Sequence, residues 1–206
     1  MSNLLHLDAS LRRDGSRSRM LSARFAQKWL AARPDGTVTY RDLAADPVPH
    51  LDEASYTTLF AEPAERTAEQ AERWAFGDVF VQELLAADSV VIGLPLYNFG
   101  PPSSFMSWLD RIVTPDRTLG RLGDKQFVFA LASGGGYGPG TPRHGWDHRE
   151  PWLRHVFDAL GVTDPVFVTA ELTLARESPM MIPLDLGEAS DQSLADALST
   201  IDRLAA

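Results

Sequence analysis

Short apolar runs alternate with longer polar stretches along the chain. The runs are rich in aliphatic, β-branched and aromatic residues and cover residues 4–7, 37–40, 89–94, 127–131 and 166–168. Runs of this length are typical of strands in a parallel sheet that is covered on both faces. The clearest case is Ser89-Val90-Val91-Ile92-Gly93-Leu94, which Pro95 ends.

Between these runs, apolar residues recur at helical spacing, which predicts amphipathic helices. The stripes are formed by Leu21, Phe25 and Trp29; by Phe105, Leu109 and Ile112; by Leu153, Phe157 and Leu160; and by Leu194, Leu198 and Ile201. A long helix is expected over residues 67–87, whereas residues 43–63, rich in Pro, Ala and Asp, predict an irregular segment. About five strands alternating with helices predict a flavodoxin-like, doubly wound α/β fold with helices on both faces of a parallel sheet. No internal repeat or linker divides the chain, so we expect a single domain over residues 1–206.

The composition excludes several kinds of site. The chain has 206 residues and no cysteine, which excludes disulfides, iron–sulfur clusters, thiolate zinc sites and cysteine nucleophiles. With 19 basic and 28 acidic residues its formal charge is −9, so nucleic acid and anionic lipid are not expected partners. The N-terminus lacks the basic region of a signal peptide, and no apolar run approaches the ~20 residues of a membrane span. We expect a soluble, cytoplasmic protein.

A ligand should bind where three loops meet. In open parallel sheets, ligands bind beyond the carboxyl ends of the strands, at the point where the strand order reverses. The loops that follow the first, third and fourth predicted strands are residues 10–18, 95–102 and 133–140. Each loop carries groups suited to a different part of a ligand.

The first loop offers hydroxyl groups and positive charge at the start of a helix. It contains Ser10, Ser16 and Ser18. Its arginines belong to a small basic cluster, for which phosphate attraction is favoured over a solvated helix start: Arg12, Arg13, Arg17 and Arg19. Hydroxyls and free N–H groups at a helix N-terminus suit a phosphate group. An ordinary N-cap, formed by Asp14 or Ser16 in a polar loop, would give a similar pattern.

The second and third loops suit a flat, polar-edged ring. Leu96-Tyr97-Asn98-Phe99 places aromatic rings on either side of an amide, and Ser133-Gly134-Gly135-Gly136 lets backbone N–H groups approach a ligand closely. The alternatives are a proline-limited turn with packed aromatic residues and a flexible glycine turn. A phosphate site, an aromatic wall and backbone donors together match the requirements of FMN.

The chain resembles the FMN-dependent NADH:quinone oxidoreductases, also called FMN-dependent azoreductases, over nearly its whole length. The resemblance rests on Ser10, Ser16-Arg17-Ser18, Arg41-Asp42-Leu43-Ala44, Pro95-Leu96-Tyr97-Asn98-Phe99, Trp108-Leu109-Asp110, Ser133-Gly134-Gly135-Gly136, Asp147-His148-Arg149-Glu150-Pro151-Trp152-Leu153 and Leu160-Gly161-Val162. It implies a homodimer that passes hydride from NADH or NADPH through FMN to quinones, and to azo compounds, by a ping-pong mechanism. The flavin itself does the chemistry, so neither a catalytic side chain nor a metal is expected.

The resemblance also implies a role for each matching residue. Ser10, Ser16, Arg17 and Ser18 would hold the FMN phosphate; Leu96, Tyr97, Asn98 and Phe99 would hold the isoalloxazine ring near its reactive nitrogen; and Ser133, Gly134, Gly135 and Gly136 would face its pyrimidine edge.

The chain departs from the family pattern in four places. Leu96 replaces a usual Met, Met106 a common Lys and Gly134 a frequent Arg. Residues 114–124 form a shortened segment that lacks the Thr-Phe-x-Tyr pattern covering the substrate side in the family. A more open site is expected from this, with broad acceptance of quinones and weaker activity on bulky azo dyes.

Other functions were weighed against the same residues. A non-enzymatic flavodoxin electron carrier shares the fold and the acidity, although its phosphate loop is usually Thr-rich. A receiver domain needs an aspartate after the third strand, where this chain has Gly93-Leu94-Pro95, and a serine hydrolase needs Gly-x-Ser-x-Gly, which Ser133 lacks. His144 and His148 would share a helix face as a possible metal pair, but no third ligand is evident, and a polar lid or interface segment is favoured.

Overall fold

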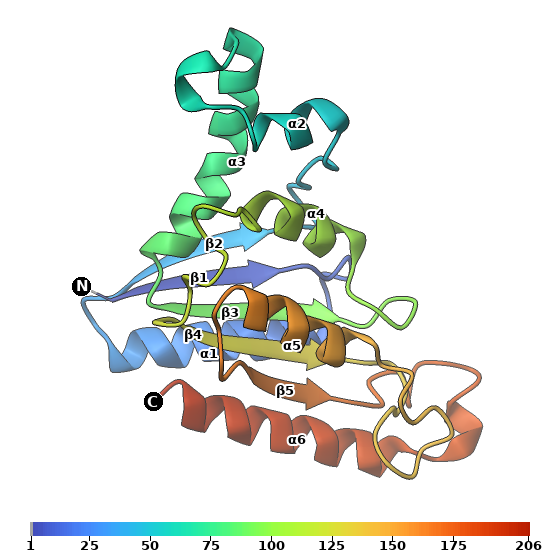
Figure 1. Ribbon diagram of the computed structural model, residues 1–206. Coiled ribbons are helices and arrows are strands. Elements are labelled where there is room, and N and C mark those ends of the chain that lie inside the picture. Colours follow the sequence, from blue (N-terminus) through green and yellow to red (C-terminus); the bar gives the residue numbers. More distant parts are fainter. Residues whose placement is uncertain (1) are drawn as a thin grey trace.

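The computed structural model describes residues 2–206, whose five strands form one parallel sheet (Figure 1). The strands are β1 (Asn3–Asp8), β2 (Thr37–Asp42), β3 (Ser89–Pro95), β4 (Gln126–Ala132) and β5 (Val166–Ala170). Their spatial order is β2-β1-β3-β4-β5, and every neighbouring pair is parallel. The chain runs outward from β1 to β2 and then returns to β3, so the order reverses between β1 and β3. The predicted flavodoxin-like, doubly wound fold is confirmed.

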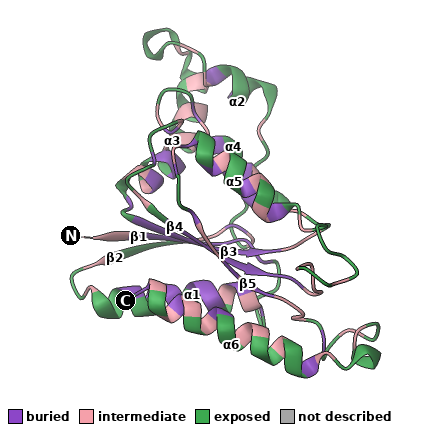
Figure 2. Ribbon diagram, turned by 60° about the horizontal axis from the view of Figure 1, so that its bottom comes forward, coloured by how far each residue is buried: buried purple, intermediate pink, exposed green. Residues whose placement is uncertain are grey.

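Helices cover both faces of the sheet. The helices α1 (Arg17–Ala32) and α6 (Gly187–Leu204) lie on one face, and α3 (Ala68–Ala86), α4 (Ser103–Ile112) and α5 (Arg149–Ala159) lie on the other (Figure 1). Val91 points into the core beneath α1 and α6, while Val90 and Ile92 point into the core beneath the other three helices. Figure 2 shows the buried strands between helices whose outer sides are exposed. Two buried faces therefore explain why the strands are apolar at successive positions.

The interval expected to be irregular contains a short helix. The helix α2 (Glu53–Thr58) lies within residues 43–63, and the 3-10 turn η1 (Pro63–Glu65) begins at the last residue of this interval. The Asp52 carboxylate caps α2 by accepting the Ser55 N–H at 2.8 Å. Six residues are too few to produce a recognisable apolar stripe, which is why the periodicity did not predict this helix. A second 3-10 turn, η2 (Ile182–Leu184), precedes α6.

Four loops gather at the carboxyl edge of the sheet. Loop 1 (residues 9–16), loop 2 (96–102), loop 3 (133–148) and loop 4 (171–186) follow β1, β3, β4 and β5. In Figure 1 they lie beyond the arrowheads of these strands.

Residues 114–124 lie at the opposite edge of the sheet, where the strands begin. The Leu122 N–H donates to the Leu160 carbonyl at 2.9 Å, and the Gln126 N–H donates to the Asp88 carbonyl at 3.0 Å. Lys125 Nζ donates to two carbonyls at the end of α3. Within one chain the whole sheet separates this segment from the carboxyl edge, so its shortening does not open a site at that edge.

Candidate functional site

The start of α1 gathers three hydroxyl groups beside loop 1. Ser16 is the N-cap, and its Oγ accepts the Arg19 N–H at 3.4 Å and lies 3.4 Å from Ser18 Oγ. Ser10, Ser16 and Ser18 are all buried. Because the first N–H groups of a helix have no partner inside the helix, those of Arg17 and Ser18 are available to a ligand. The N-cap by Ser16 is present, and it leaves these two N–H groups free, so it does not exclude a phosphate ligand.

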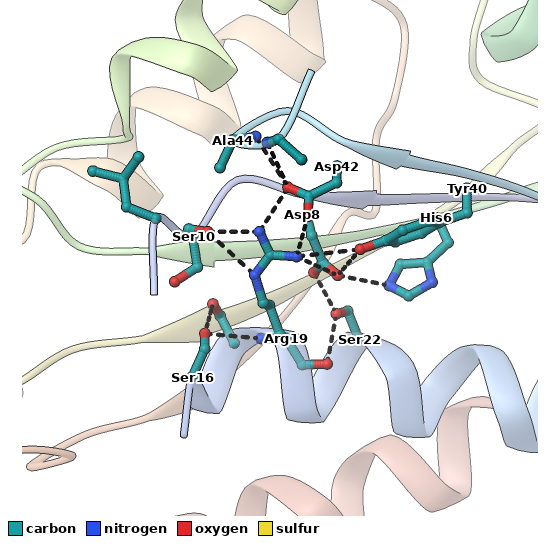
Figure 3. Close-up of polar contacts among 12 residues, drawn as sticks. His6, Asp8, Ser10, Ser16, Arg19, Ser22, Tyr40, Asp42 and Ala44 are labelled. Carbon is teal, nitrogen blue, oxygen red and sulfur yellow. Dashed lines mark hydrogen bonds and ion pairs between the residues drawn. The ribbon is translucent and has the colours of Figure 1, made fainter. Parts of the chain in front are cut away.

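Arg19 anchors loop 1 to the sheet from behind (Figure 3). Its guanidinium donates to the two oxygens of Asp42 at 2.6 and 2.9 Å and to the Ser10 carbonyl at 2.6 and 3.2 Å. It also donates to Tyr40 Oη at 3.2 Å, and lies 3.6 Å from the Asp8 carboxylate. The residue therefore joins α1, β2 and the first residue of the phosphate-binding set.

The acidic side of this cluster is tied to β1, β2 and α1. The Asp8 carboxylate accepts Ser22 Oγ–H at 2.7 Å and Tyr40 Oη–H at 3.1 Å, and His6 Nε2 lies 3.5 Å away. Burial and the Asp8 charge raise the pKa of Tyr40 to about 12. Burial alone would raise the pKa of Asp42, but hydrogen bonds from Arg19 and two backbone N–H groups outweigh it and hold that pKa below its usual value.

Loop 2 contains a tight turn with two strained residues. Tyr97 and Gly100 exchange backbone hydrogen bonds of 3.0 and 2.9 Å, and between them Asn98 and Phe99 adopt positive φ values of 48° and 66°. Non-glycine residues take this conformation only when the surroundings impose it. Within residues 2–206 the N–H groups of Asn98 and Phe99 have no acceptor, so both can donate to a ligand.

Loop 3 is held by loop 4 and is not a flexible turn. Three N–H groups of loop 4 donate to the carbonyls of Ser133, Gly134 and Gly135 at 3.0 to 3.2 Å. A Cβ on Gly134 would lie 2.7 Å from Leu174 Cδ1, so a larger residue here would displace the part-exposed Leu174 side chain. Across the described part of the chain, the Gly134 and Gly135 N–H groups have no acceptor. The N–H groups of Gly134 and Gly135 are thus free to donate to a ligand, while the carbonyls of residues 133–135 attach the stretch to loop 4.

Further hydrogen bonds join the loops to one another. The Leu11 N–H of loop 1 donates to Tyr97 Oη at 3.1 Å, and Arg12 pairs with Glu177 of loop 4 at 2.7 Å. The His148 N–H of loop 3 donates to the Phe99 carbonyl at 3.0 Å. Contacts of this kind fix the positions of the loops before any ligand arrives.

The predicted loops form one pocket. It is lined by Ser10, Arg12, Gly15, Ser16, Arg17, Ser18, Pro95, Leu96, Tyr97, Ala132, Gly134, Thr173 and Leu174. Asn98, Phe99, Ser133, Gly135 and Gly136 belong to the same loops but lie outside this lining. Phe99 instead packs edge-on against Trp146 and Tyr137, with ring centroids 5.5 and 6.3 Å apart. These three rings form an aromatic wall next to the pocket.

The basic residues of the first loop have separate roles. Arg17 and Arg12 line the pocket, but Arg12 also pairs with Glu177. Arg19 faces the buried carboxylates instead of the pocket, so its expected part in attracting phosphate is wrong. His144 lies in a turn and His148 precedes α5, so the two do not share a helix face.

Sequence reasoning missed several residues of the site. Thr173 and Leu174 lie in the loop after β5, and the rule that selected the other three loops applies to this one as well. The side chain of Arg149 is also buried, and that of Arg19 is mostly buried. Their burial could not be predicted from the sequence, because charged residues near helix starts are usually exposed to solvent.

Comparisons with known proteins give the following similarities. The sequence profile of a family described by its flavodoxin-like fold matches residues 2–191. An FMN-dependent NADH:quinone oxidoreductase of Frankia alni is 46% identical over 188 residues, covering 88% of this chain and 89% of the relative. A relative of the same description from Nocardia farcinica is 45% identical over 217 aligned positions, covering 99% and 98%.

Solved structures give the same fold. An azoreductase from Bacillus anthracis superposes with a TM-score of 0.86 at 22% identity, over 100% of this chain and 99% of that chain. An FMN-dependent NADH-azoreductase from the same organism, in complex with FMN, gives a TM-score of 0.80 at 22% identity over 100% of both chains. At this identity the two structures show the architecture alone.

Proposed function

The chain belongs to the flavodoxin-like family of FMN-dependent NADH:quinone oxidoreductases, and we propose that it binds FMN in the pocket at the carboxyl edge and transfers hydride from NADH to quinones. The observation that carries the proposal is the convergence of buried hydroxyls and backbone donors from loops 1, 2 and 3. The identity of about two fifths or more to curated relatives, over nearly whole chains, supports the same activity.

The donor set suits both ends of FMN. Three buried serine hydroxyls, the N-terminus of α1 and the Arg17 guanidinium provide donors and positive charge for a phosphate. The unpaired N–H groups of loops 2 and 3 suit the polar edge of an isoalloxazine ring. FMN supplies the hydride chemistry itself.

The side chains and backbone of the chain have three tasks in this reaction. Loop 1 holds the phosphate, and the N–H groups of Asn98, Gly134 and Gly135 hold the ring and stabilise negative charge that develops on it. The part-exposed Phe99 ring, which Tyr137 and Trp146 support edge-on, offers an aromatic face for stacking a nicotinamide or a quinone. Because one pocket serves both, we infer that the two substrates use it in turn.

The test is the visible spectrum of the purified protein after incubation with FMN. Flavin bands, bleaching by NADH without oxygen, and reoxidation by a benzoquinone are expected, with parallel lines in double-reciprocal plots. A protein that stays colourless contradicts the proposal. Intersecting lines indicate a ternary complex, and a bound flavin that NADH does not reduce indicates an electron carrier.

A pair of loop 1 variants tests the phosphate site. Arg17→Gln should raise the Kd for FMN about fivefold to tenfold but leave the Kd for riboflavin unchanged, because only FMN carries the phosphate. Arg13→Gln is the control, since Arg13 is exposed and outside the pocket lining. Equal effects of the two substitutions would remove Arg17 from the phosphate site.

We also propose that two copies of the chain associate through an arm, residues 53–79, which contains α2, η1 and the first part of α3. This arm projects from the sheet in Figure 1 and exposes Tyr56, Phe60, Phe76 and Val79, whose exposed fractions are 54%, 61%, 44% and 47%. Clustered exposed apolar side chains of this kind are typical of an interface. Light scattering should give twice the chain mass of 22.7 kDa.

The substitution Phe60→Asp should yield a monomer if this face is the interface. Leu184→Asp, at an equally exposed position (59%) in loop 4, is the control and should leave the mass unchanged. A wild-type monomer at micromolar concentration contradicts the association.

A further inference from the structure

Arg149 is charged but completely buried. It is the first residue of α5, and its side chain has an exposed fraction of 0%. A charge shielded from water is costly unless polar groups surround it. Burial lowers the pKa of Arg149, an effect that Asp147 opposes. The roles proposed above make no use of this residue.

The Arg149 guanidinium bridges two strands at the points where they become loops. Its Nη1 donates to the Leu94 carbonyl at 2.7 Å and to the Ala132 carbonyl at 3.1 Å. Leu94 is the penultimate residue of β3 and Ala132 is the last residue of β4. The Ala132 carbonyl also accepts the Leu96 N–H at 2.8 Å. One nitrogen therefore connects the beginnings of loops 2 and 3.

Asp147 fixes the direction of the Arg149 side chain. One carboxylate oxygen accepts the Arg149 backbone N–H at 2.8 Å, and the other accepts Nη2–H at 2.9 Å. The Asp147 carboxylate is mostly buried, with an exposed fraction of 20%. Asp147, just before α5, thus holds the guanidinium in the orientation in which it contacts the strand carbonyls.

The residue before Arg149 holds the other end of loop 2. The His148 N–H donates to the carbonyl of Phe99, which with Asn98 forms the turn of positive φ. Residues 147–149 consequently hold loop 2 at Leu94 and at Phe99. The strained turn lies between these two points of attachment.

We propose that Arg149 is a positioning residue of the flavin site: its guanidinium locks the carboxyl ends of β3 and β4, so that the N–H donors of loops 2 and 3 keep a fixed spacing. This inference rests on the proposed function, which supplies the ligand that needs the spacing. The contact lies below the pocket, and it should affect binding of the isoalloxazine ring but not binding of the phosphate.

The test compares Arg149→Met with Arg154→Met. Arg154 lies on the same helix, is half exposed (52%) and pairs with Glu150, so it is a matched control. In the protein without flavin, backbone hydrogen exchange over residues 95–100 and 132–136 should be about tenfold faster in Arg149→Met and unchanged in Arg154→Met. The Kd values for FMN and for riboflavin should rise together, by about tenfold or more, because the ring end is disturbed.

The outcomes separate the two proposals. Exchange rates and both Kd values within twofold of wild type in a folded Arg149→Met protein overturn the role of Arg149. If wild-type protein binds no flavin but Arg149→Met still accelerates exchange in both loops, the proposed function fails and the locking role stands.

A second variant covers the case in which Arg149→Met does not fold. Asp147→Asn keeps the guanidinium but removes the carboxylate charge that orients it. Faster exchange confined to loops 2 and 3 in this variant supports the proposal, and unchanged exchange overturns it.

Discussion

Replacing Arg19 by Met tests whether the buried cluster behind loop 1 holds the fold together at this point. The substitution removes a bidentate ion pair to Asp42, with distances of 2.6 and 2.9 Å, and two hydrogen bonds to the Ser10 carbonyl. The paired side chains have exposed fractions of only 13% and 16%, so solvent screens the interaction weakly. The Asp42 carboxylate would be left in a mostly buried place without its cation.

The magnitude follows from what remains after the substitution. Breaking a buried ion pair by removing one partner costs about 3–5 kcal/mol. Asp42 keeps hydrogen bonds from the Ala44 and Ala45 N–H groups at 3.1 Å each, which places the expected loss at the lower end, about 3 kcal/mol. For a chain of this size the melting temperature should fall by about 6–12 °C.

The assay is urea unfolding at pH 7 and at acid pH, with Arg24→Met as the control. Arg24 lies on the same helix and pairs with Asp202, but the two side chains have exposed fractions of 41% and 33%. A surface pair of this kind is worth about 0–1 kcal/mol. The Arg24 variant should therefore unfold almost as wild type does.

The pH dependence has a definite sign. Arg19 helps to hold the pKa of Asp42 below its usual value, so the pair contributes stability above the unfolded-state pKa of about 3.9. That contribution is lost as the pH falls through the lower folded-state pKa. The difference between wild type and Arg19→Met should therefore shrink below about pH 4.

A double-mutant cycle with Asp42→Asn gives the result that would refute the reasoning. Asp42→Asn should destabilise the wild type but be nearly neutral beside Arg19→Met, with a coupling energy of about 1.5 kcal/mol or more. Additive effects within about 0.5 kcal/mol would show that the two side chains act independently.

Three further changes address the strand beneath loop 1, the glycine loop and the cluster tyrosine. Gly93→Ala would place a Cβ 2.2 Å from Asp8 Oδ1 and 3.1 Å from the Ser18 carbonyl. The free energy of unfolding should fall by about 3 kcal/mol or more, and FMN should bind more weakly. A variant as stable as wild type would contradict this packing. Gly135→Pro removes an N–H donor, so the Kd for FMN, measured by fluorescence titration, should rise by about tenfold. An unchanged Kd and an unchanged rate of flavin reduction would show that the Gly135 N–H does not bind the flavin. Because the pKa of Tyr40 is raised to about 12, its contribution to stability is complete below about pH 10 and is lost between about pH 10 and 12. Tyr40→Phe should weaken the alkaline decline in unfolding free energy, and identical profiles would contradict this account.

The regular part of the fold could be predicted because periodicity records burial. Val90, Val91 and Ile92 are apolar at successive positions since alternate side chains enter two cores, and the helices show one apolar stripe each. The helix α2 escaped prediction because its six residues are stabilised by a cap and not by a stripe.

The part of the site that could be predicted from the sequence follows from one topological rule. Carboxyl ends of parallel strands share an edge, so the loops containing Ser16, Tyr97 and Gly134 had to meet. The same rule places residues 114–124 at the other edge, because a segment that leads from a helix into a parallel strand lies where that strand begins. The shortened length of the segment therefore does not by itself open the pocket of the same chain, and the expected range of acceptors stays a prediction.

The role left to residues 114–124 is at the association face. Arg117, within the segment, forms an ion pair with Asp78 and lies against the Trp74 ring of α3. The segment therefore borders the arm through which we propose that two chains associate. If the proposed association is right, the length of the segment can act on substrate choice at the site of the other copy.

Backbone strain is concentrated at the carboxyl edge of the sheet. Among residues 2–206, the non-glycine residues with positive φ are Asn98, Phe99, Leu172 and Asp185, and all four lie in loops 2 and 4. Each such residue costs about 1–3 kcal/mol and persists only where the surroundings determine it. The buried guanidinium of Arg149 adds a desolvation cost at the same edge. The opposite edge also buries a charge, Lys125, with an exposed fraction of 7%, but among the described residues it has no non-glycine residue of positive φ. The two positive-φ residues of loop 2 keep N–H groups that no described carbonyl accepts, whereas the N–H groups of Leu172 and Asp185 donate to the carbonyls of Gly135 and Ile182.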